Sequence, residues 1–385
     1  MKHALIRWKN LPYDRKVFVV KHARFQIPSD VSWEDSLVVI GEDDLIHSEY
    51  RHVLMTERVR QKRLFSGTGI SVEDLPSLDD GDIVSYEKRS DRLEIIFEIK
   101  SKTNSLYVTN ACNSHCQFCP QPSTCDDGSL YDAAMDVIRL VANAGDVVNV
   151  TGGEPTLLRS RMLSLLEHAA KKWPTTKLCV LTNGRLFKDS SYVDDIFKIR
   201  SAETISFGIP LYADSAVVHD AVVGVAGAYS QTIKGLYNLA CMKAEIEVRF
   251  VVSKLSYKRL PKLVEFIGRN LPFINRIAVM GLEPTGYCRE RWIDFWIDPE
   301  ETAEELVAAA SIANNYNITL WLYNMQLCCL PTTLHNIACV SISEWKRVYA
   351  NECNACSMRK SCGGFFASQN EKKFLPRRFN AQGHY

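Results

Sequence analysis

The 385-residue chain lacks long hydrophobic runs, an excess of charge of either sign, and low-complexity or repeated segments. No apolar run approaches the roughly 18 residues that a membrane-spanning helix needs. Because 46 Lys and Arg residues stand against 45 Asp and Glu residues, there is no electrostatic argument for nucleic acid as the main partner. The first residues, Met1–Lys16, contain no secretory hydrophobic segment. We therefore expect a cytoplasmic protein with neither a nucleic-acid nor a membrane partner.

Cysteine is more frequent than such a protein needs. Thirteen cysteines are too few, and odd in number, for a disulfide scaffold, and in a reducing compartment clustered thiols indicate a metal site or catalysis. Two groups of three stand out by their spacing. They are C-x3-C-x2-C at Cys112, Cys116 and Cys119, and C-x2-C-x5-C at Cys353, Cys356 and Cys362.

The hydrophobic pattern predicts an α/β protein of three parts. Residues 1–100 contain short β-rich runs separated by turn signals, which predicts a small β-rich N-terminal domain. Residues 101–316 alternate apolar strands with amphipathic helices, which predicts a parallel sheet with helices outside it, as in a partial (β/α)6 barrel. Residues 317–385 form a loop-rich C-terminal region that carries the second cysteine group.

Six strands and six helices are predicted in the barrel part. The strands are 105–110, 146–151, 177–183, 203–209, 245–252 and 276–282. The helices are about 130–143, 159–172, 190–199, 229–243 and 260–270, and one that begins after the N-cap Asp298. In β/α barrels the loops after the strands carry the chemistry. The first cysteine group, Gly152-Gly153-Glu154 and Asn183 each follow a predicted strand, so we expect them on the same rim.

The first cysteine group supplies three thiolates from one short loop. A structural zinc site and an electron-transfer iron–sulfur cluster each commonly take four protein ligands. Three cysteines therefore favour a 4Fe-4S cluster with one open iron. His115 and Cys125 are the local alternatives for a fourth ligand.

This spacing, with Phe118 before the last cysteine and a GGE triplet after the next strand, resembles the radical S-adenosylmethionine (SAM) superfamily. The resemblance implies that the open iron binds the amino and carboxylate groups of S-adenosylmethionine, which is cleaved to a 5′-deoxyadenosyl radical. It also implies that Phe118 lies near the adenine and that Gly152, Gly153 and Glu154 bind the methionine ammonium group. Asn183 resembles the third-strand motif of the same superfamily. A reductant protein such as flavodoxin or ferredoxin is then expected.

The second cysteine group resembles half of the auxiliary-cluster pattern in SPASM and twitch extensions. The fourth cysteine of that pattern is replaced by Phe366, so we expect one auxiliary 4Fe-4S cluster rather than two. Its ligands would be Cys353, Cys356 and Cys362 with Cys328 from upstream, Cys329 and Cys339 being the alternatives. A zinc site with the same residues remains open, because a four-thiolate set suits both metals.

Longer stretches, among them VTGGEPTLL, MGLEPTG, YNMQLC, SISEWK and CGGFFAS, resemble the His-Xaa-Ser system radical SAM maturases of the C type. That family is implicated in modifying a ribosomally made precursor peptide, beside a companion radical SAM protein and a small accessory protein. Residues 1–100 would either dock the peptide on exposed strand edges or cap the barrel. A small-molecule substrate and a non-catalytic iron–sulfur or zinc protein are the other hypotheses. No catalytic acid, base or nucleophile can be assigned.

Overall fold

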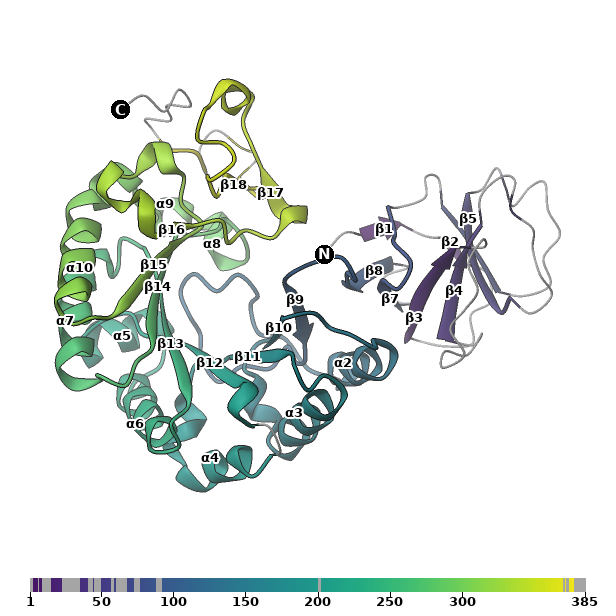
Figure 1. The fold of residues 1–385 in the computed structure, drawn as a ribbon, viewed down its shortest axis with the longest axis horizontal. Helices are drawn as coiled ribbons and strands as arrows, with labels where there is room; N and C mark the ends of the chain where they lie inside the picture. The colour runs from purple at the N-terminus through teal and green to yellow at the C-terminus, as the bar shows by residue number, and fades with distance from the viewer. Residues whose placement is uncertain are drawn as a thin grey trace. The chain divides into compact units, whose positions relative to one another are not determined.

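The computed structural model describes residues 92–199 and 202–369 without a break and parts of the remainder. Those parts are 3–5, 7–8, 15–22, 35–40, 44, 50–56, 59, 68–72, 77–87, 371 and 374–376. The chain divides into two compact units (Figure 1). The first unit comprises 1–109, 126–151 and 164–178, and the second comprises 110–125, 152–163 and 179–385. Among the described residues, no helix has both the length and the apolar character needed to cross a membrane.

The first unit contains an eight-stranded mixed sheet, as the β-rich runs of residues 1–100 predict. Its strands are β1 His3–Leu5, β2 Arg7–Trp8, β3 Arg15–His22, β4 Ser36–Val39, β5 His52–Thr56, β6 Thr68–Val72, β7 Ile83–Glu87 and β8 Arg92–Phe97. Their order is β1-β8-β7-β3-β4-β5-β6-β2, with β3 to β6 parallel and the other pairs antiparallel. The two ends of this order, β1 and β2, are one residue apart in the sequence. Segment 3–8 therefore bridges both ends and closes the sheet.

This closure bears on how residues 1–100 could bind a peptide. Strand addition needs an unpaired edge, and the bridging segment occupies part of the edges of β6 and β8. Inside the sheet, Leu37 and Val39 of β4 pack in one hydrophobic cluster, whereas Val38 and Ile40 pack in another. Strand β4 is thus buried on both faces, which explains its unbroken apolar sequence. Peptide docking on this domain stays a prediction.

The second sheet has the predicted parallel architecture, with eight strands where six were predicted. They are β9 Asn104–Tyr107, β10 Val147–Thr151, β11 Lys177–Leu181, β12 Ile205–Pro210, β13 Glu245–Val251, β14 Arg276–Met280, β15 Thr319–Tyr323 and β16 Ala338–Cys339. They follow one another in sequence order across the sheet. The added strands β15 and β16 are parallel to β14, so the sheet continues past the predicted barrel end at residue 316.

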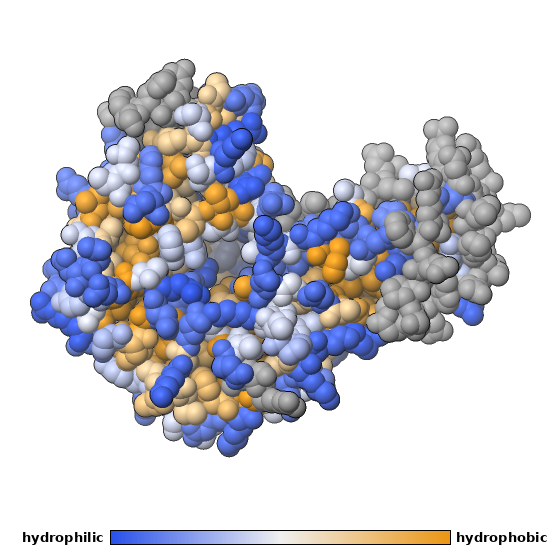
Figure 2. Space-filling model, viewed as in Figure 1, coloured by the Kyte–Doolittle hydropathy of each residue, from blue (hydrophilic) through white to orange (hydrophobic). Residues whose placement is uncertain are grey.

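The six predicted helices are confirmed, with one addition between β12 and β13. They are α2 Ser129–Leu140, α3 Ser160–Lys172, α4 Ser190–Phe197, α6 Ala228–Cys241, α7 Leu260–Asn270 and α10 Ala303–Asn315. The addition is α5 Ala216–Val223. Asp298 caps the 3-10 turn η6 Pro299–Thr302 that leads into α10, accepting from the backbone N–H of Glu300. Figure 1 shows α6, α7 and α10 on the outer side of strands β13 to β15, and hydrophilic residues gather on this outer surface (Figure 2).

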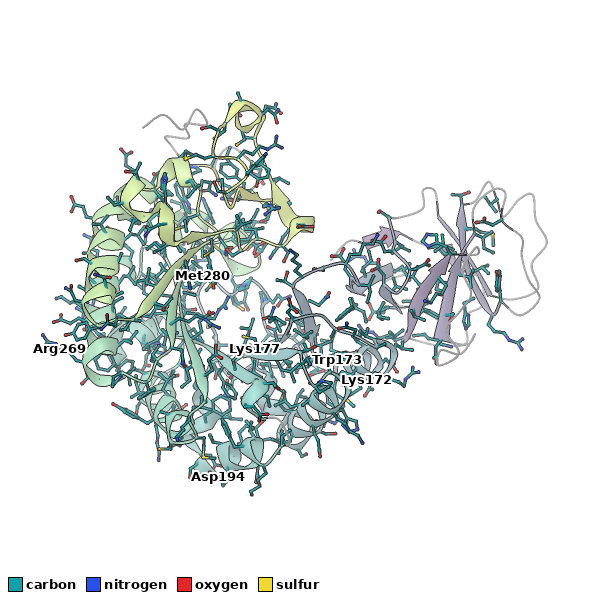
Figure 3. The ribbon with its side chains drawn as sticks, viewed as in Figure 1. Lys172, Trp173, Lys177, Asp194, Arg269 and Met280 are labelled. Atoms are coloured by element: carbon teal, nitrogen blue, oxygen red, sulfur yellow. The ribbon has the colours of Figure 1, made fainter. Side chains whose placement is uncertain are left out.

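Alternation along β13 and β14 separates two faces of the sheet. Ile277 and Val279 of β14 are fully buried beneath the helices. Arg276, Ala278 and Met280 point to the opposite face, called the inner face below. In Figure 3, Met280 lies on the inner part of the sheet, whereas Arg269 of α7 lies at the outer rim.

The C-terminal region is built from short elements. After β15 come the turns η7 Leu327–Cys329, η8 Thr332–Ile337, η9 Glu344–Lys346 and η10 Asn351–Ala355. A two-stranded antiparallel ribbon pairs β17 Arg347–Val348 with β18 Phe365–Phe366. The insertion between β14 and η6 adds two single-turn helices, α8 Tyr287–Glu290 and α9 Trp292–Phe295.

Candidate functional site

The first cysteine group lies on the loop after β9, and its backbone is fixed by α5. The N–H groups of His115 and Gln117 donate to the carbonyls of Val223 and Val222, both at 2.9 Å. Gly224, with a φ of +69°, lets the loop come close, because a Cβ at this position would lie 2.5 Å from the carbonyl oxygen of His115. The loop is therefore held by contacts from distant residues.

The three thiols of this loop influence one another. Burial, together with the nearby thiols of Cys119 and Cys112, raises the pKa of Cys116 to about 12. The backbone N–H of Ser114 donates to Cys112 Sγ at 3.4 Å, and that of Cys119 donates to the Cys116 carbonyl at 3.1 Å. Deprotonation is therefore unfavourable for these three half-buried thiols on one loop. A bound metal removes this penalty because it favours the deprotonated sulfur.

The GGE turn after β10 touches the cysteine loop backbone to backbone. The N–H of Glu154 donates to the carbonyl of Ala111 at 2.7 Å. A Cβ on Gly153 would lie 2.2 Å from that same oxygen and 2.8 Å from the carbonyl oxygen of Asn110. Only glycine fits this approach, so the two motifs predicted to share a rim are in direct contact.

Glu154 is fully buried, and its carboxylate accepts four hydrogen bonds from its own chain. Oε1 accepts from the backbone N–H of Thr156 at 3.1 Å, from the Thr156 hydroxyl at 2.5 Å and from the Thr182 hydroxyl at 2.6 Å. Oε2 accepts from the N–H of Asn183 at 2.6 Å. Burial raises the pKa of Glu154, while these donors act in the opposite direction. The side chain ties the GGE turn to the loop after β11, and the predicted contact with an ammonium group stays a prediction.

Asn183 and Arg185 connect the loop after β11 to the cysteine loop. Asn183 Nδ2 donates to Asn113 Oδ1 at 2.7 Å. The Arg185 guanidinium donates to the carbonyl of Asn113, to Ser114 Oγ at 3.0 Å and to Gln231 Oε1 at 2.8 Å. Sequence reasoning missed Arg185, although it stands in the LTNGR motif beside Asn183. Its buried charge lowers the pKa values of Cys112 and Cys116, which burial raises.

Phe118 lies in a hydrophobic cluster and is 5% exposed. Its ring makes edge contacts with Tyr212 at 5.5 Å and with Phe295 of α9 at 6.0 Å between centroids. Cys116 packs against the same cluster. The role predicted for Phe118 beside an adenine stays a prediction, and in this structure the ring anchors the cysteine loop.

The local alternatives for a fourth ligand are exposed. Both His115 and Cys125 have exposed side chains. Among the described residues, no three Cys, His, Asp or Glu side chains are placed to hold a single metal ion.

The second cysteine group lines a hollow together with Cys328. Cys328, Cys353, Cys356 and Cys362 line one small hollow, and its other lining includes Tyr349. Burial raises the pKa of Cys353, and the thiols of Cys362, Cys328 and Cys356 raise it further. The four residues predicted as ligands are therefore brought together, three from the C-terminal segment and one from η7.

The two alternatives to Cys328 lie differently. Cys329 Sγ is 3.9 Å from Cys328 Sγ, but Cys329 does not line the hollow. Cys339 is the last residue of β16, in register with Tyr323 of β15, and also lies outside the lining. Gln326 supports the hollow by donating to the Gly364 carbonyl at 2.8 Å.

Residues 106–267 match the family model described as the Radical SAM superfamily. The chain contains a radical SAM domain. Its matched segment holds the cysteine loop, the GGE turn and the loop after β11. The general fold and cofactor class that the sequence resemblance implied are thereby confirmed, whereas the His-Xaa-Ser subfamily, the second cluster and the partners stay predictions.

Curated proteins and solved structures are both similar to this chain. The AdoMet-dependent heme synthase of Oleidesulfovibrio alaskensis is 26% identical over 231 residues, covering 57% of this chain and 52% of that protein. The chain thus spans about half the length of this curated relative. Streptococcus suis SuiB is 20% identical, with 59% and 49% of the two chains covered and a TM-score of 0.46. Native anSMEcpe with bound AdoMet and a peptide is 14% identical, with 72% and 93% covered and a TM-score of 0.48.

Proposed function

We propose that this protein cleaves S-adenosylmethionine at a 4Fe-4S cluster bound by Cys112, Cys116 and Cys119, and that it modifies a ribosomally made precursor peptide of the His-Xaa-Ser type. When bound, the cluster would supply the electron for this cleavage, and S-adenosylmethionine would supply the radical chemistry directed at the substrate. The observation that carries the proposal is the backbone contact between the cysteine loop and the GGE turn. It places three thiols and a glycine-lined backbone at one point, which suits a cluster with a bound amino acid.

The residues of this chain orient the cofactor rather than react with it. Gly153 has no side chain, which lets the GGE turn lie directly against the backbone of the cysteine loop. Glu154, Asn183 and Arg185 hold the three loops in register through hydrogen bonds. This division agrees with the general rule that the cofactor performs the difficult chemistry and the protein positions and shields it.

The second cysteine group supports an auxiliary 4Fe-4S cluster. Cys328, Cys353, Cys356 and Cys362 line the same hollow, and four cysteines are the usual ligand set of a 4Fe-4S cluster. The same four thiolates also suit a single Zn²⁺, so the iron and sulfide content distinguishes the two groups. Either group would stabilise the short elements of residues 317–369, since metal binding contributes folding free energy.

A small-molecule substrate is the second candidate. It is favoured by the similarity to AdoMet-dependent heme synthases over 57% of this chain. The companion radical SAM protein, the accessory protein and a flavodoxin or ferredoxin reductant belong to the peptide hypothesis.

The test is an anaerobic purification followed by three measurements: iron and sulfide content, deoxyadenosine release, and the mass of a candidate His-Xaa-Ser peptide. We expect about eight irons in the wild type and about four in each of Cys112→Ala and Cys353→Ala. Deoxyadenosine release should disappear in Cys112→Ala. Release without a mass change on the peptide would favour a small molecule, and no release from the fully loaded wild type would leave a non-catalytic metal protein.

A further inference from the structure

The inner face of strands β13 to β15 carries charged and aromatic side chains that the proposed chemistry does not use. Register places Glu247 beside Arg276, and Arg249 beside Ala278 and then Trp321. Glu247 Oε1 accepts from Arg249 at 2.7 Å, and Oε2 accepts from Arg276 at 2.7 Å. A carboxylate that is 7% exposed is thus bracketed by two guanidinium groups.

Arg249 is held in a defined position. On β12 it is in register with Pro210, and its stem lies against Gly208, where a Cβ would lie 3.0 Å from Arg249 Cδ and 2.7 Å from Leu181 Cδ2. Because Gly208 has no side chain, the aliphatic part of the Arg249 side chain can pack against it. On the other side, one guanidinium nitrogen of Arg249 lies 3.1 Å from the thioether sulfur of Met280.

The guanidinium of Arg249 has more N–H donors than the contacts described above use. It carries five N–H groups, of which Glu247 takes one strongly and the Met280 sulfur, a weak acceptor, takes another. Arg276 is better matched, since it donates to both Glu247 and Glu245. The Arg249 side chain is 25% exposed, so its remaining donors are open to a ligand with strong acceptors.

Arg249 also lies on the side of the sheet that carries the cysteine loop. It is two residues before the carboxyl end of β13, and its carbonyl accepts from Leu211 at 3.1 Å. The next residue, Tyr212, packs edge-on against Phe118 of the cysteine loop, with 5.5 Å between the ring centroids.

We propose that Arg249 binds a carboxylate group of the substrate on the inner face of the sheet. A planar guanidinium with free, partly shielded donors suits a carboxylate, which it can hold through two parallel hydrogen bonds. For a peptide this group is an Asp or Glu side chain or the chain end. The inference rests on the proposed function, because the resemblance assigns the carboxylate of S-adenosylmethionine to the open iron and leaves Arg249 for the substrate.

The experiment measures protection of Arg249 from phenylglyoxal in the anaerobically purified holoenzyme, read by peptide-mapping mass spectrometry. The probes are N-acetylglutamate amide and its uncharged twin, N-acetylglutamine amide. We expect the glutamate probe to protect at a concentration about tenfold lower than the glutamine probe, which is the preference expected for charge-assisted hydrogen bonds. Arg269, on the outer rim in Figure 3 and ion-paired with Glu265, is the internal control and should respond to neither probe.

Calorimetry gives a second readout that does not depend on the modification. Arg249→Lys keeps the charge and loses the paired geometry, so the affinity for the glutamate probe should fall about tenfold, whereas Arg269→Lys should leave it unchanged. Equal protection by the two probes, or none by either, overturns the proposal. Protection by S-adenosylmethionine that decarboxylated S-adenosylmethionine does not give would also overturn it, by assigning Arg249 to the cofactor. Deoxyadenosine release is assayed separately, so failure of the proposed function is distinguished from failure of this site.

Discussion

Gly153→Ala tests the contact on which the proposed function rests. The added Cβ would meet the Ala111 carbonyl oxygen at 2.2 Å and its carbon at 2.7 Å, and ordinary contacts begin at 3.4 Å. Because both atoms belong to the backbone, no side chain can swing away to relieve the overlap. The GGE turn and the cysteine loop must therefore separate by about 1 Å, a displacement typical of an overpacked site.

The expected loss follows from that separation. Overpacking of this kind costs about 1–3 kcal/mol, and the hydrogen bond from Glu154 to Ala111, now 2.7 Å long, is worth about 1 kcal/mol. We expect the free energy of unfolding to fall by about 2–4 kcal/mol. A shift of about 1 Å in a group that positions reactants can cost roughly 100-fold in rate, so deoxyadenosine release should fall by about that factor.

The measurements are urea unfolding, iron content and the rate of deoxyadenosine release. Gly145→Ala is the matched control, because Gly145 has a φ of +79° and no atom lies within 4 Å of the place that its Cβ would take. It should cost roughly 1–2 kcal/mol through backbone strain and leave iron content and rate unchanged. If Gly153→Ala behaves like this control, or like the wild type, the steric argument for the paired motifs is refuted.

Three further substitutions test other parts of the site. Burial lowers the pKa of His219 to about 4, and its Nδ1 accepts from the Tyr212 N–H. Because the pKa of histidine in the unfolded chain is near 6.5, stability is lost as the pH falls from about 6.5 toward 4. In urea unfolding, the wild type should therefore lose about 1 kcal/mol more than His219→Gln between pH 7.5 and 5.5. Arg185→Gln removes a buried positive charge beside the cysteine loop, so the midpoint potential of the catalytic cluster should fall by roughly 60 mV. Arg185→Lys keeps the charge and should recover most of this potential. Redox titration followed by electron paramagnetic resonance measures both variants, and potentials equal to that of the wild type would exclude an electrostatic role. Cys328→Ser should lose about four irons and Cys329→Ser none, and the reverse result would assign the upstream ligand to Cys329.

The architecture of the barrel was predictable because its signal is local and periodic. Strands such as 245–251 are apolar at every second residue, and each is followed by an amphipathic helix, so a window of a few residues suffices. Strand β15 has the same kind of pattern but stands alone after the last helix. Strand β16 is two residues long and is defined only by its pairing with Leu322 and Tyr323. No local hydrophobic pattern predicts a strand of this length.

The closed sheet of the first unit shows the same limit. Short β-rich runs are visible in residues 1–100, but their order is set by pairings between distant segments. Segment 3–8 pairs with β8 through Leu5 and Arg92 and with β6 through Trp8 and Ile70. That bridge determines how much strand edge is unpaired, and so it bears on the peptide-docking hypothesis. No local sequence pattern predicts it.

The cysteine spacing located both candidate metal sites, because ligands on one short loop are necessarily near each other. The residues that hold such a loop come from elsewhere in the chain. Arg185 and Gln231 are 46 positions apart, and Arg185 is 72 positions from Asn113. The motif LTNGR pointed to the right loop, but only the fold shows that the arginine at its end supports the cysteines.

Glu154 shows that a sequence motif can locate a site residue correctly without predicting which group that residue binds. The GGE triplet led us to expect that the carboxylate would bind an ammonium group. In the structure this carboxylate already satisfies donors from Thr156, Thr182 and Asn183, and a buried carboxylate with four donors gains little from a further cation. The neighbouring Gly152 and Gly153 are half-buried and carry no side chain of their own. We therefore infer that Gly152 and Gly153 carry the cofactor contact while Glu154 fixes their position, so that Glu154→Gln should disturb the loops before it disturbs the affinity for S-adenosylmethionine.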